Sequence, residues 1–330
     1  MDKTKVITLK KKPKEFLELD CFSIEERPIR ELLEGEVLLK TIYLSIDAAN
    51  RAWIAGPTYR SEVLVGDIMP AYGVAEVIES KDINFKKGDL ASGEINWAEY
   101  TINFGKLLTK EKPIKNPADL FTYRGIAGLT AFHGLINVAK IKPKDTVLVS
   151  SAAGSVGMFA CQIAKLTGCN VIGLSSSEEK CVWVRKNLGI DTCFDYTKGD
   201  LVRVLKKHCP EGIDVYFDNV GGSLLENVLY NMKIHGRVAC CGAVSQYDTS
   251  GNYGPKNIPG ILVTKRLRLQ GFLVMDFTSE NQEALEILSK WSSCGHLKVF
   301  TDEYIGLEKA PIALINLLSG KNMGKTLVKL

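Results

Sequence analysis

A glycine-containing loop near the middle of the chain has the residue types and spacing that bind phosphate groups. Ala152–Gly157 follows the apolar run Val147–Ser151 and precedes Met158–Thr167, a segment typical of a helix. Gly154 lets the backbone approach a pyrophosphate, and Gly157 lets the helix pack close to its strand. The amino end of such a helix presents N–H groups and a partial positive charge. The spacing matches GxGxxG except for an alanine at the first position, and it predicts a dinucleotide site; a strand–helix turn without a ligand is the alternative.

The tip of the next strand, Asn170–Leu174, bears on the choice between NAD and NADP. NAD enzymes usually carry a carboxylate there, which accepts hydrogen bonds from the ribose hydroxyls. Here three serines, 175–177, follow the strand, and Lys180 lies in the first turn of the expected helix Glu178–Leu188. A cation with hydroxyl donors fits the 2′-phosphate of NADP. A solvated helix lysine is the alternative, and these residues alone leave both interpretations open.

No cysteine or histidine spacing indicates a zinc site. The nine cysteines are irregularly spaced, and no two of them form a CxxC pair. The four histidines are far apart in the sequence. Zinc sites need several thiolate or imidazole ligands, usually at short spacings. We therefore expect no metal ligands, and we expect reduced, mostly buried cysteines in a cytoplasmic protein.

The charge pattern argues against a nucleic-acid partner. The net charge is only +4, and the main basic cluster, Lys10–Lys12 with Lys14, is short and broken by proline. No apolar run is long enough to span a bilayer, and the charged N-terminal residues do not resemble a signal peptide. We expect a small-molecule substrate and neither nucleic acid nor a membrane as partner.

The order of apolar segments predicts two domains. Short strand candidates dominate the first third: Val6–Leu9, Glu36–Ile42 and Gly73–Glu79. After Tyr123, helical and strand-like segments alternate, from a helical stretch at Gly125–Ala139 to a last strand at Leu267–Val274 and a helix at Glu280–Trp291. This alternation predicts a parallel sheet with right-handed crossovers. The tail (298–330) reads as strand, helix, strand. We expect a nucleotide-binding domain over 124–298, inserted into a β-barrel domain over 1–123 and 299–330.

Several further motifs resemble the medium-chain dehydrogenase/reductase superfamily. They are Gly128–Phe132, Cys161–Lys165, Glu179–Cys181, Phe217–Gly222, Gly242–Tyr247 and Asn322–Thr326. Together with the glycine loop they are similar to its zinc-independent branch of prostaglandin reductases, alkenal/one oxidoreductases and double-bond reductases. The resemblance implies an α/β fold, with a Rossmann-type doubly wound parallel sheet inserted into a GroES-like β-barrel domain. It also implies NADPH as cofactor and reduction of the carbon–carbon double bond of enones and enals.

The resemblance further implies roles for individual residues. Tyr247 would be the catalytic hydrogen-bond donor to the enolate oxygen. Lys180 and Tyr196 would meet the 2′-phosphate, and Asn322 would reach the cofactor from the tail. The full set of cofactor-binding residues it implies is Gly154, Ser155, Val156, Gly157, Lys180, Tyr196, Asn219, Cys241, Gly242, Ala243, Val244, Ser245, Gln246, Tyr247, Phe272, Leu273, Val274 and Asn322. Relatives pair edge strands into a homodimer, and Leu267–Val274 would be that edge here.

Two segments depart from the family pattern, at 47–53 and 69–73, and both are expected to border the substrate pocket. Trp53, Tyr59 and Tyr72 are candidate lining residues there. Zinc-dependent alcohol oxidation is disfavoured because no cysteine occupies 45–47, where the first ligand would fall. A quinone reductase, which shares fold and cofactor, and a cofactor-binding regulatory protein without turnover stay open as alternatives.

Overall fold

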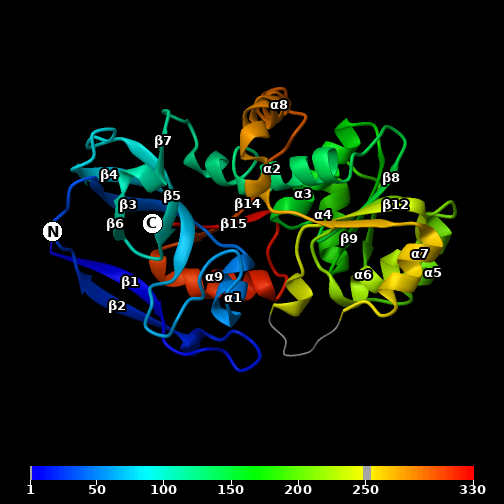
Figure 1. Ribbon diagram of the computed structural model, residues 1–330, viewed down its shortest axis with the longest axis horizontal. Helices are drawn as coiled ribbons and strands as arrows, with labels where there is room; N and C mark the ends of the chain where they lie inside the picture. Colours follow the sequence, from blue (N-terminus) through cyan, green and yellow to red (C-terminus); the bar gives the residue numbers. More distant parts are fainter. Residues whose placement is uncertain (1, 248–253) are drawn as a thin grey trace. The chain divides into compact units, whose positions relative to one another are not determined.

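The chain folds into two compact units in the computed structural model, which describes residues 2–247 and 254–330. Unit 1 comprises Met1–Leu120, Thr301–Asn322 and Thr326–Leu330, and therefore takes its residues from both ends of the chain (Figure 1). Unit 2 comprises Phe121–Phe300 and Met323–Lys325. None of the helices within the described ranges is long and apolar enough to cross a bilayer.

Unit 2 is built on a parallel six-stranded sheet in the order β10-β9-β8-β11-β12-β13. The first strand along the chain, β8, lies inside the sheet, and the strand order reverses between β8 and β11, as in doubly wound nucleotide-binding folds. The predicted Rossmann-type sheet is thus confirmed. The strands are β8 (Thr146–Ser150), β9 (Asn170–Ser175), β10 (Thr192–Asp195), β11 (Ile213–Asp218), β12 (Met232–Cys240) and β13 (Arg268–Gly271).

Helices pack against this sheet because its central strands are apolar on both faces. In β8, Val147, Leu148 and Val149 are completely buried, which is typical of a parallel strand covered on both sides. The helices of unit 2 are α2 (Ile126–His133), α3 (Ser155–Leu166), α4 (Glu178–Leu188), α5 (Leu201–His208), α6 (Gly222–Leu229), α7 (Ile258–Lys265) and α8 (Asn281–Ser293).

Two sequence-based predictions for unit 2 need correction. The expected helix Gly125–Ala139 is α2 followed by a π-helical turn at Gly134–Val138. Gly134 sits there because a Cβ on it would lie 2.6 Å from the Phe272 ring and 2.5 Å from the Phe217 ring. The last strand was predicted to run through Val274, and this was wrong. It ends at Gly271, because Phe272 turns inward and packs edge-on against Phe217, with ring centroids 6.4 Å apart.

Unit 1 is built on a second, mainly antiparallel sheet in the order β14-β15-β3-β4-β5-β7, with β6 paired to β3. The three predicted strands of the first third lie within β1, β3 and β4. The elements of unit 1 are β1 (Lys3–Leu9), β2 (Phe22–Pro28), β3 (Glu36–Ser45), α1 (Ala49–Ala55), β4 (Pro70–Ser80), β5 (Leu90–Asn96), β6 (Tyr100–Phe104), β7 (Leu108–Glu111), β14 (Thr301–Ile305), α9 (Ala310–Leu318) and β15 (Lys325–Lys329).

A carboxylate at the start of β3 ties down the turn that precedes it. Both oxygens of Glu36 accept hydrogen bonds from the Arg30 guanidinium, at 2.6 and 2.7 Å, and the N–H of Leu33 donates to the same carboxylate at 2.8 Å. The Arg30 guanidinium, and then the Leu33 N–H, lower the pKa of Glu36 from about 4.5 to about 2. Paired charge–charge hydrogen bonds of this geometry favour the ionised form.

This depressed pKa predicts an acid-dependent contribution to stability. The contribution is fully present above a pH of about 4.5 and is lost as the pH falls towards about 2, because the unfolded state then binds the proton more readily. Glu36→Gln should flatten the dependence of the unfolding midpoint on pH in this window, measured by urea titration at several pH values. Glu76→Gln, at an exposed position on β4, is the control and should leave the dependence unchanged. Equal slopes for the wild type and Glu36→Gln would contradict the assignment.

Candidate functional site

The glycine loop connects β8 to α3 with a very close backbone approach. An ideal Cβ on Gly157 would lie 2.0 Å from the carbonyl oxygen of Ser151, so this position accepts no side chain without a backbone shift. The N–H of Gly154 donates to the same Ser151 oxygen at 2.8 Å and closes the turn. The helix therefore starts directly beside the carboxyl end of its strand, as the sequence spacing predicted.

The amino end of α3 fits a phosphate group. Its N-cap, Gly154, has no side chain, so it cannot cap the first-turn N–H groups of Ser155, Val156 and Gly157. The Ser155 hydroxyl is buried and has no hydrogen-bond partner within residues 2–247 and 254–330. A buried, unsatisfied hydroxyl is costly unless a ligand pairs with it. Helix N–H groups and an available hydroxyl are a donor set that suits an anion.

The tail of the chain lies on this loop. The N–H of Gly324 donates to the carbonyl oxygen of Ala153 at 2.8 Å, and Gly324 forms a parallel bridge with Gly154. Gly324 has a φ of +84°, and a Cβ on it would lie 2.3 Å from the Phe300 carbonyl oxygen. Both constraints require glycine. Asn322, which is buried, stands two residues before this bridge.

The tip of β9 gathers hydroxyl groups and a buried cation. Ser177 caps α4, where its hydroxyl accepts a hydrogen bond from the N–H of Lys180 at 3.3 Å. Lys180 is only 7% exposed, so the alternative of a solvated helix lysine was wrong. The N–H of Tyr196 donates to the carbonyl oxygen of Ser175 at 3.1 Å, and burial raises the pKa of the Tyr196 hydroxyl. Tyr196 therefore keeps its proton at neutral pH and can donate it.

A buried carboxylate organises the end of β11. Oδ1 of Asp218 accepts hydrogen bonds from the Tyr216 hydroxyl at 2.8 Å and from the N–H groups of Val220 and Gly221 at 3.0 and 2.9 Å. Burial raises the pKa of Asp218, although these donors act in the opposite direction. The carboxyl group fixes the turn that contains Asn219.

Asn219 is held against the strand that leads into the glycine loop. Its backbone N–H donates to the Ser150 hydroxyl at 2.9 Å, and its side-chain Nδ2 donates to the Ser150 carbonyl oxygen at 2.7 Å. Because Nδ2 is used in this contact, the amide offers its Oδ1 as an acceptor for a ligand. Two of the predicted site segments, the glycine loop and the Asn219 turn, are thus joined through one serine.

The segment 241–247 is attached to the same turn by backbone hydrogen bonds. The N–H groups of Cys241 and Gly242 donate to the Asp218 carbonyl oxygen at 2.8 and 3.1 Å. Further along, the N–H of Ser245 donates to the Val220 carbonyl oxygen at 3.2 Å, and its hydroxyl does so at 2.7 Å. The N–H of Val244 donates to the backbone carbonyl oxygen of Asn219, and the N–H of Gln246 donates to that of Ala243. The structure therefore brings together the predicted residues 219 and 241–247.

Tyr247 folds back over its own loop. Its hydroxyl accepts a hydrogen bond from the N–H of Ala243 at 3.3 Å, which leaves the hydroxyl proton for donation elsewhere. Burial raises the pKa of Tyr247, so the phenol stays protonated at neutral pH.

The predicted residues 272–274 are placed differently from the loop residues. Phe272 and Val274 pack against the hydrophobic core of unit 2, whereas Leu273 is exposed. Phe272 contacts the ring of Phe217, the residue before Asp218, and so lies beneath the end of β11. A packing role explains these contacts fully.

Sequence reasoning missed Ser150, Tyr216 and Asp218. A usable signal was present, since Ser150 and Asp218 are polar residues at the ends of two apolar strand runs, and such ends lie at the ligand-binding edge of a parallel sheet. The Ser150 hydroxyl donates to Asp218 Oδ1 at 3.4 Å, across 68 positions of the chain, and no motif in the sequence links the two strands.

In unit 1, the two segments that depart from the family pattern contact each other. The Nδ2 of Asn50, in α1, donates to the carbonyl oxygen of Pro70 at 3.0 Å. Trp53 packs edge-on against Tyr59, with ring centroids 6.3 Å apart. The Tyr72 hydroxyl lies 3.3 Å from the Ser92 hydroxyl, and burial raises the pKa of Tyr72. As for metals, no group of three His, Cys, Asp or Glu side chains in the described part of the chain is placed to hold an ion.

Comparisons with known proteins identify the family. Residues 155–290 match the family model for zinc-binding dehydrogenase, and residues 5–110 match that for the N-terminal domain of oxidoreductase. The chain is 40% identical to prostaglandin reductase 1 from Mus musculus, over 100% of both chains. The chain belongs to the NADP-dependent medium-chain dehydrogenase/reductase family. This confirms the resemblance drawn from its motifs.

Other members of the family are similar over most of the chain. The NADP-dependent 2-alkenal reductase from Nicotiana tabacum is 39% identical, over 89% of this chain and 87% of that protein. The crystal structure of CurA from Vibrio vulnificus superposes with a TM-score of 0.93 at 32% identity, covering 99% of this chain and 98% of CurA. CurA has also been solved in complex with NADPH. The α/β fold with two structural units is therefore that of the family.

The close approach at Gly157 generates a prediction. Gly157→Ala should destabilise the protein by about 1–3 kcal/mol, because the added methyl group overpacks against the Ser151 carbonyl. It should also weaken binding of a dinucleotide by displacing the start of α3. Thermal unfolding and a fluorescence titration with NADPH measure the two effects. Gly56→Ala is the control, since nothing lies within 4 Å of its ideal Cβ; equal behaviour of the two variants would contradict the prediction.

Proposed function

We propose that the protein reduces the carbon–carbon double bond of α,β-unsaturated ketones and aldehydes with NADPH and without a metal. The observation that carries the proposal is the buried Lys180, whose N–H is capped by the Ser177 hydroxyl after β9, in a chain whose relatives are named as reductases of such compounds. Those relatives include prostaglandin reductase 1, a 2-alkenal reductase and the (+)-pulegone reductase of Mentha piperita. The substrate class includes 15-oxo-prostaglandins.

The residues of unit 2 hold the cofactor. Gly154, Ser155, Val156 and Gly157 bind the pyrophosphate, and Lys180 and Tyr196 bind the 2′-phosphate through a cation and a hydroxyl donor. Asn219 contributes its Oδ1 as an acceptor for a ribose hydroxyl. The segment 241–247 borders the nicotinamide, and its hydrogen bonds to the Asn219 turn support this role. The roles of 272–274 beside the nicotinamide and of Asn322 from the tail follow the family pattern alone. We further propose 124–298 as the nucleotide-binding domain.

When bound, NADPH supplies the hydride that is added to the β-carbon of the substrate. Tyr247 donates a hydrogen bond to the substrate carbonyl oxygen, where negative charge develops during the transfer. Its raised pKa suits this role, because the phenol remains protonated at neutral pH. The α-carbon then takes a proton from solvent or through Tyr247.

We propose a homodimer in the cytoplasm. The strand β13 is at the edge of the six-stranded sheet, so its outer N–H and C=O groups are available for pairing with a second copy. Light scattering measures the oligomeric state.

The reaction is tested by a screen of NADPH consumption with purified protein over enals, enones, 15-oxo-prostanoids and quinones. We expect turnover of enals or enones and a product that is a saturated carbonyl compound, identified by mass spectrometry. Turnover of quinones alone, or an unsaturated alcohol as product, would overturn the proposal. Elemental analysis should find no stoichiometric zinc.

Lys180→Ala should weaken binding of NADPH roughly 10- to 100-fold, because a charge-assisted contact to phosphate contributes about 1.5–3 kcal/mol. Affinity for NADH should hardly change, because NADH lacks the 2′-phosphate. Isothermal titration with both nucleotides measures the effect. Lys186→Ala, at an exposed position on the same helix, is the control. Similar losses for NADPH and NADH would indicate general damage instead.

Tyr247→Phe should lower kcat about 100-fold with a saturating enone, because removing a donor to a developing oxyanion typically costs two to three orders of magnitude. The dissociation constant of NADPH should change much less. Steady-state kinetics and a nucleotide titration separate the two. Tyr230→Phe, at an exposed tyrosine, is the control. An unchanged kcat for Tyr247→Phe would remove this residue from the mechanism.

A further inference from the structure

Positive charge gathers where the strands of the parallel sheet in unit 2 begin. It comes from four separate segments, 140–145, 206–214, 230–237 and 265–268. We call these segments the basic edge. They contain ten Lys and Arg but three Asp and Glu, a net charge of +7 within a chain whose net charge is +4. The segments precede or begin β8, β11, β12 and β13. Because these strands are parallel, the basic edge lies at their amino ends, and the loops of the candidate site lie at their carboxyl ends.

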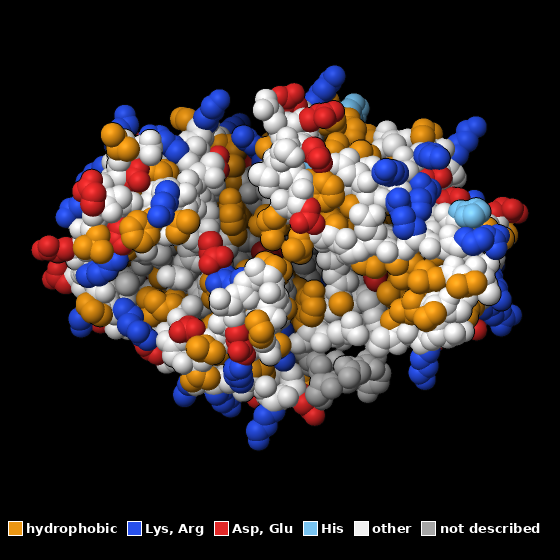
Figure 2. Space-filling model, viewed as in Figure 1, with side chains coloured by type: hydrophobic (Ala, Val, Ile, Leu, Met, Phe, Trp, Pro, Cys, Tyr) orange, Lys and Arg blue, Asp and Glu red, His pale blue; other side chains and the backbone are white. Residues whose placement is uncertain are grey.

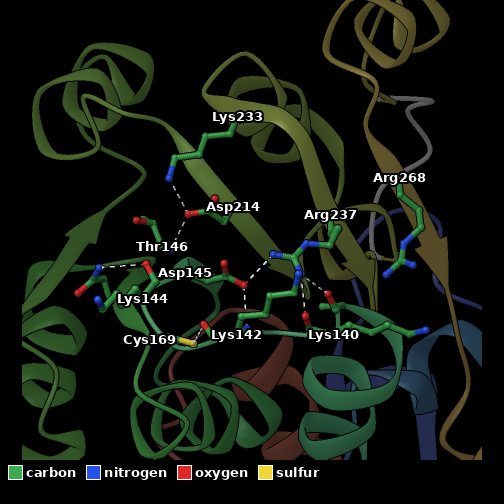
Figure 3. A network of polar contacts seen from close by, with 12 residues as sticks. Lys140, Lys142, Lys144, Asp145, Thr146, Cys169, Asp214, Lys233, Arg237 and Arg268 are labelled. Atoms are coloured by element: carbon green, nitrogen blue, oxygen red, sulfur yellow. Dashed lines mark hydrogen bonds and ion pairs between the residues drawn. The ribbon is translucent and has the colours of Figure 1, made fainter.

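Polar contacts join the four segments into one surface (Figure 3). Arg237 forms an ion pair with Asp145 at 2.7 Å, and Lys233 forms one with Asp214 at 2.8 Å. The Nζ of Lys265 donates to the carbonyl oxygens of residues 230 and 232 at 2.9 and 2.6 Å. Figure 3 shows the ion-paired side chains of 233 and 237 next to the loop that carries Lys140, Lys142 and Lys144.

Most of the positive charge on this surface is not neutralised by the protein. Lys140, Lys142, Lys144, Lys206 and Lys207 are exposed, and none of them forms an ion pair with another residue of the described ranges. Burial, and then the charge of Lys206, lowers the pKa of Lys265, so a cation of one segment acts on a cation of another. Such crowding is unfavourable unless an anionic partner binds.

The helix dipole explains only part of the positive charge on the basic edge. Cations in the last turn of a helix interact favourably with the helix dipole, which accounts for Lys206 and Lys207 in α5 and for Lys265 in α7. The lysines of 140–144 lie in a loop, and Lys233 and Arg237 lie in β12, where no helix terminus requires them.

Exposed hydrophobic side chains lie among these cations. Tyr230 is 48% exposed, Ile234 is 56% exposed, and Val263, two residues before Lys265, is 74% exposed. Figure 2 shows hydrophobic side chains close to Lys and Arg over the part of unit 2 where Figure 1 labels α5 and α7. Surfaces that bind single-stranded nucleic acid use several aromatic side chains for stacking, and here Tyr230 is the one aromatic of the three. The two more exposed side chains, Ile234 and Val263, are branched aliphatic groups, which beside lysines fit the boundary between lipid headgroups and acyl chains.

We propose that the basic edge docks reversibly on a membrane surface rich in anionic phospholipid. The lysines contact the headgroups, and Ile234 and Val263 enter the interfacial layer. The loops of the candidate site, at the carboxyl ends of the same strands, then face away from the membrane. This inference does not rest on the proposed reaction. It departs from the sequence-based expectation of no membrane partner, because these lysines are scattered along the chain and gather only in the fold.

Vesicle co-sedimentation of the full chain tests the proposal. Phosphatidylcholine vesicles should retain little protein, and vesicles that also contain phosphatidylserine should bind it in a salt-sensitive manner. Lys206→Gln with Lys207→Gln should lower the partition coefficient about 25-fold, since each lysine near an anionic surface contributes a factor of about five. Ile234→Ser should lower it as well, without any change in charge.

Matched controls come from unit 1. Lys86 and Lys87 are also an adjacent exposed pair, and Ile83, 99% exposed, stands near them in the sequence. Lys86→Gln with Lys87→Gln, and separately Ile83→Ser, should leave the partition coefficient unchanged. Absence of binding to anionic vesicles, or equal losses in the two sets of variants, would overturn the proposal. Tighter binding to single-stranded RNA that is insensitive to Ile234→Ser would overturn it in favour of a nucleic-acid partner.

Discussion

The candidate site depends on the hydrogen bonds that the buried carboxylate of Asp218 accepts. A charge at this depth is tolerated only when donors surround it, and here two hydroxyls and two backbone N–H groups do so. The same turn accepts the backbone of 241–247 and presents Asn219 to Ser150, at the entrance to the glycine loop. Three segments from three strands are thus joined by hydrogen bonds to one turn of unit 2.

Local chemistry explains what could be predicted from the sequence. The glycine loop and α4 were predicted correctly because their signals lie within a few neighbouring residues, and α4 has the predicted bounds. The contact between Ser150 and Asp218 could not be predicted, because only the strand order β8-β11 brings these residues together. The end of β13 was predicted wrongly for a similar reason: the inward turn of Phe272 is determined by packing against Phe217, not by its own segment. The basic edge likewise exists only after folding.

The two segments that depart from the expected family pattern, 47–53 and 69–73, lie in unit 1. Asn50 and Pro70 join the two variant segments directly, so a change in one shifts the support of the other. Around them, Trp53 and Tyr59 pack together, and the Arg60 guanidinium lies 4.6 Å from the Trp53 ring centroid. The two variant segments are therefore supported by contacts within unit 1.

Enals and enones are electrophiles that alkylate thiolates, and this chain carries two adjacent cysteines at the end of β12. Burial raises the pKa of Cys240 to about 11 and that of Cys241 to about 12. Because the thiolate is the nucleophile, a thiol with a pKa of about 12 is ionised in roughly one molecule in 10⁵ at neutral pH. Cys294 is the exposed cysteine of the described residues. Burial thus keeps the two adjacent thiols of β12 in their protonated form, which reacts poorly with such electrophiles.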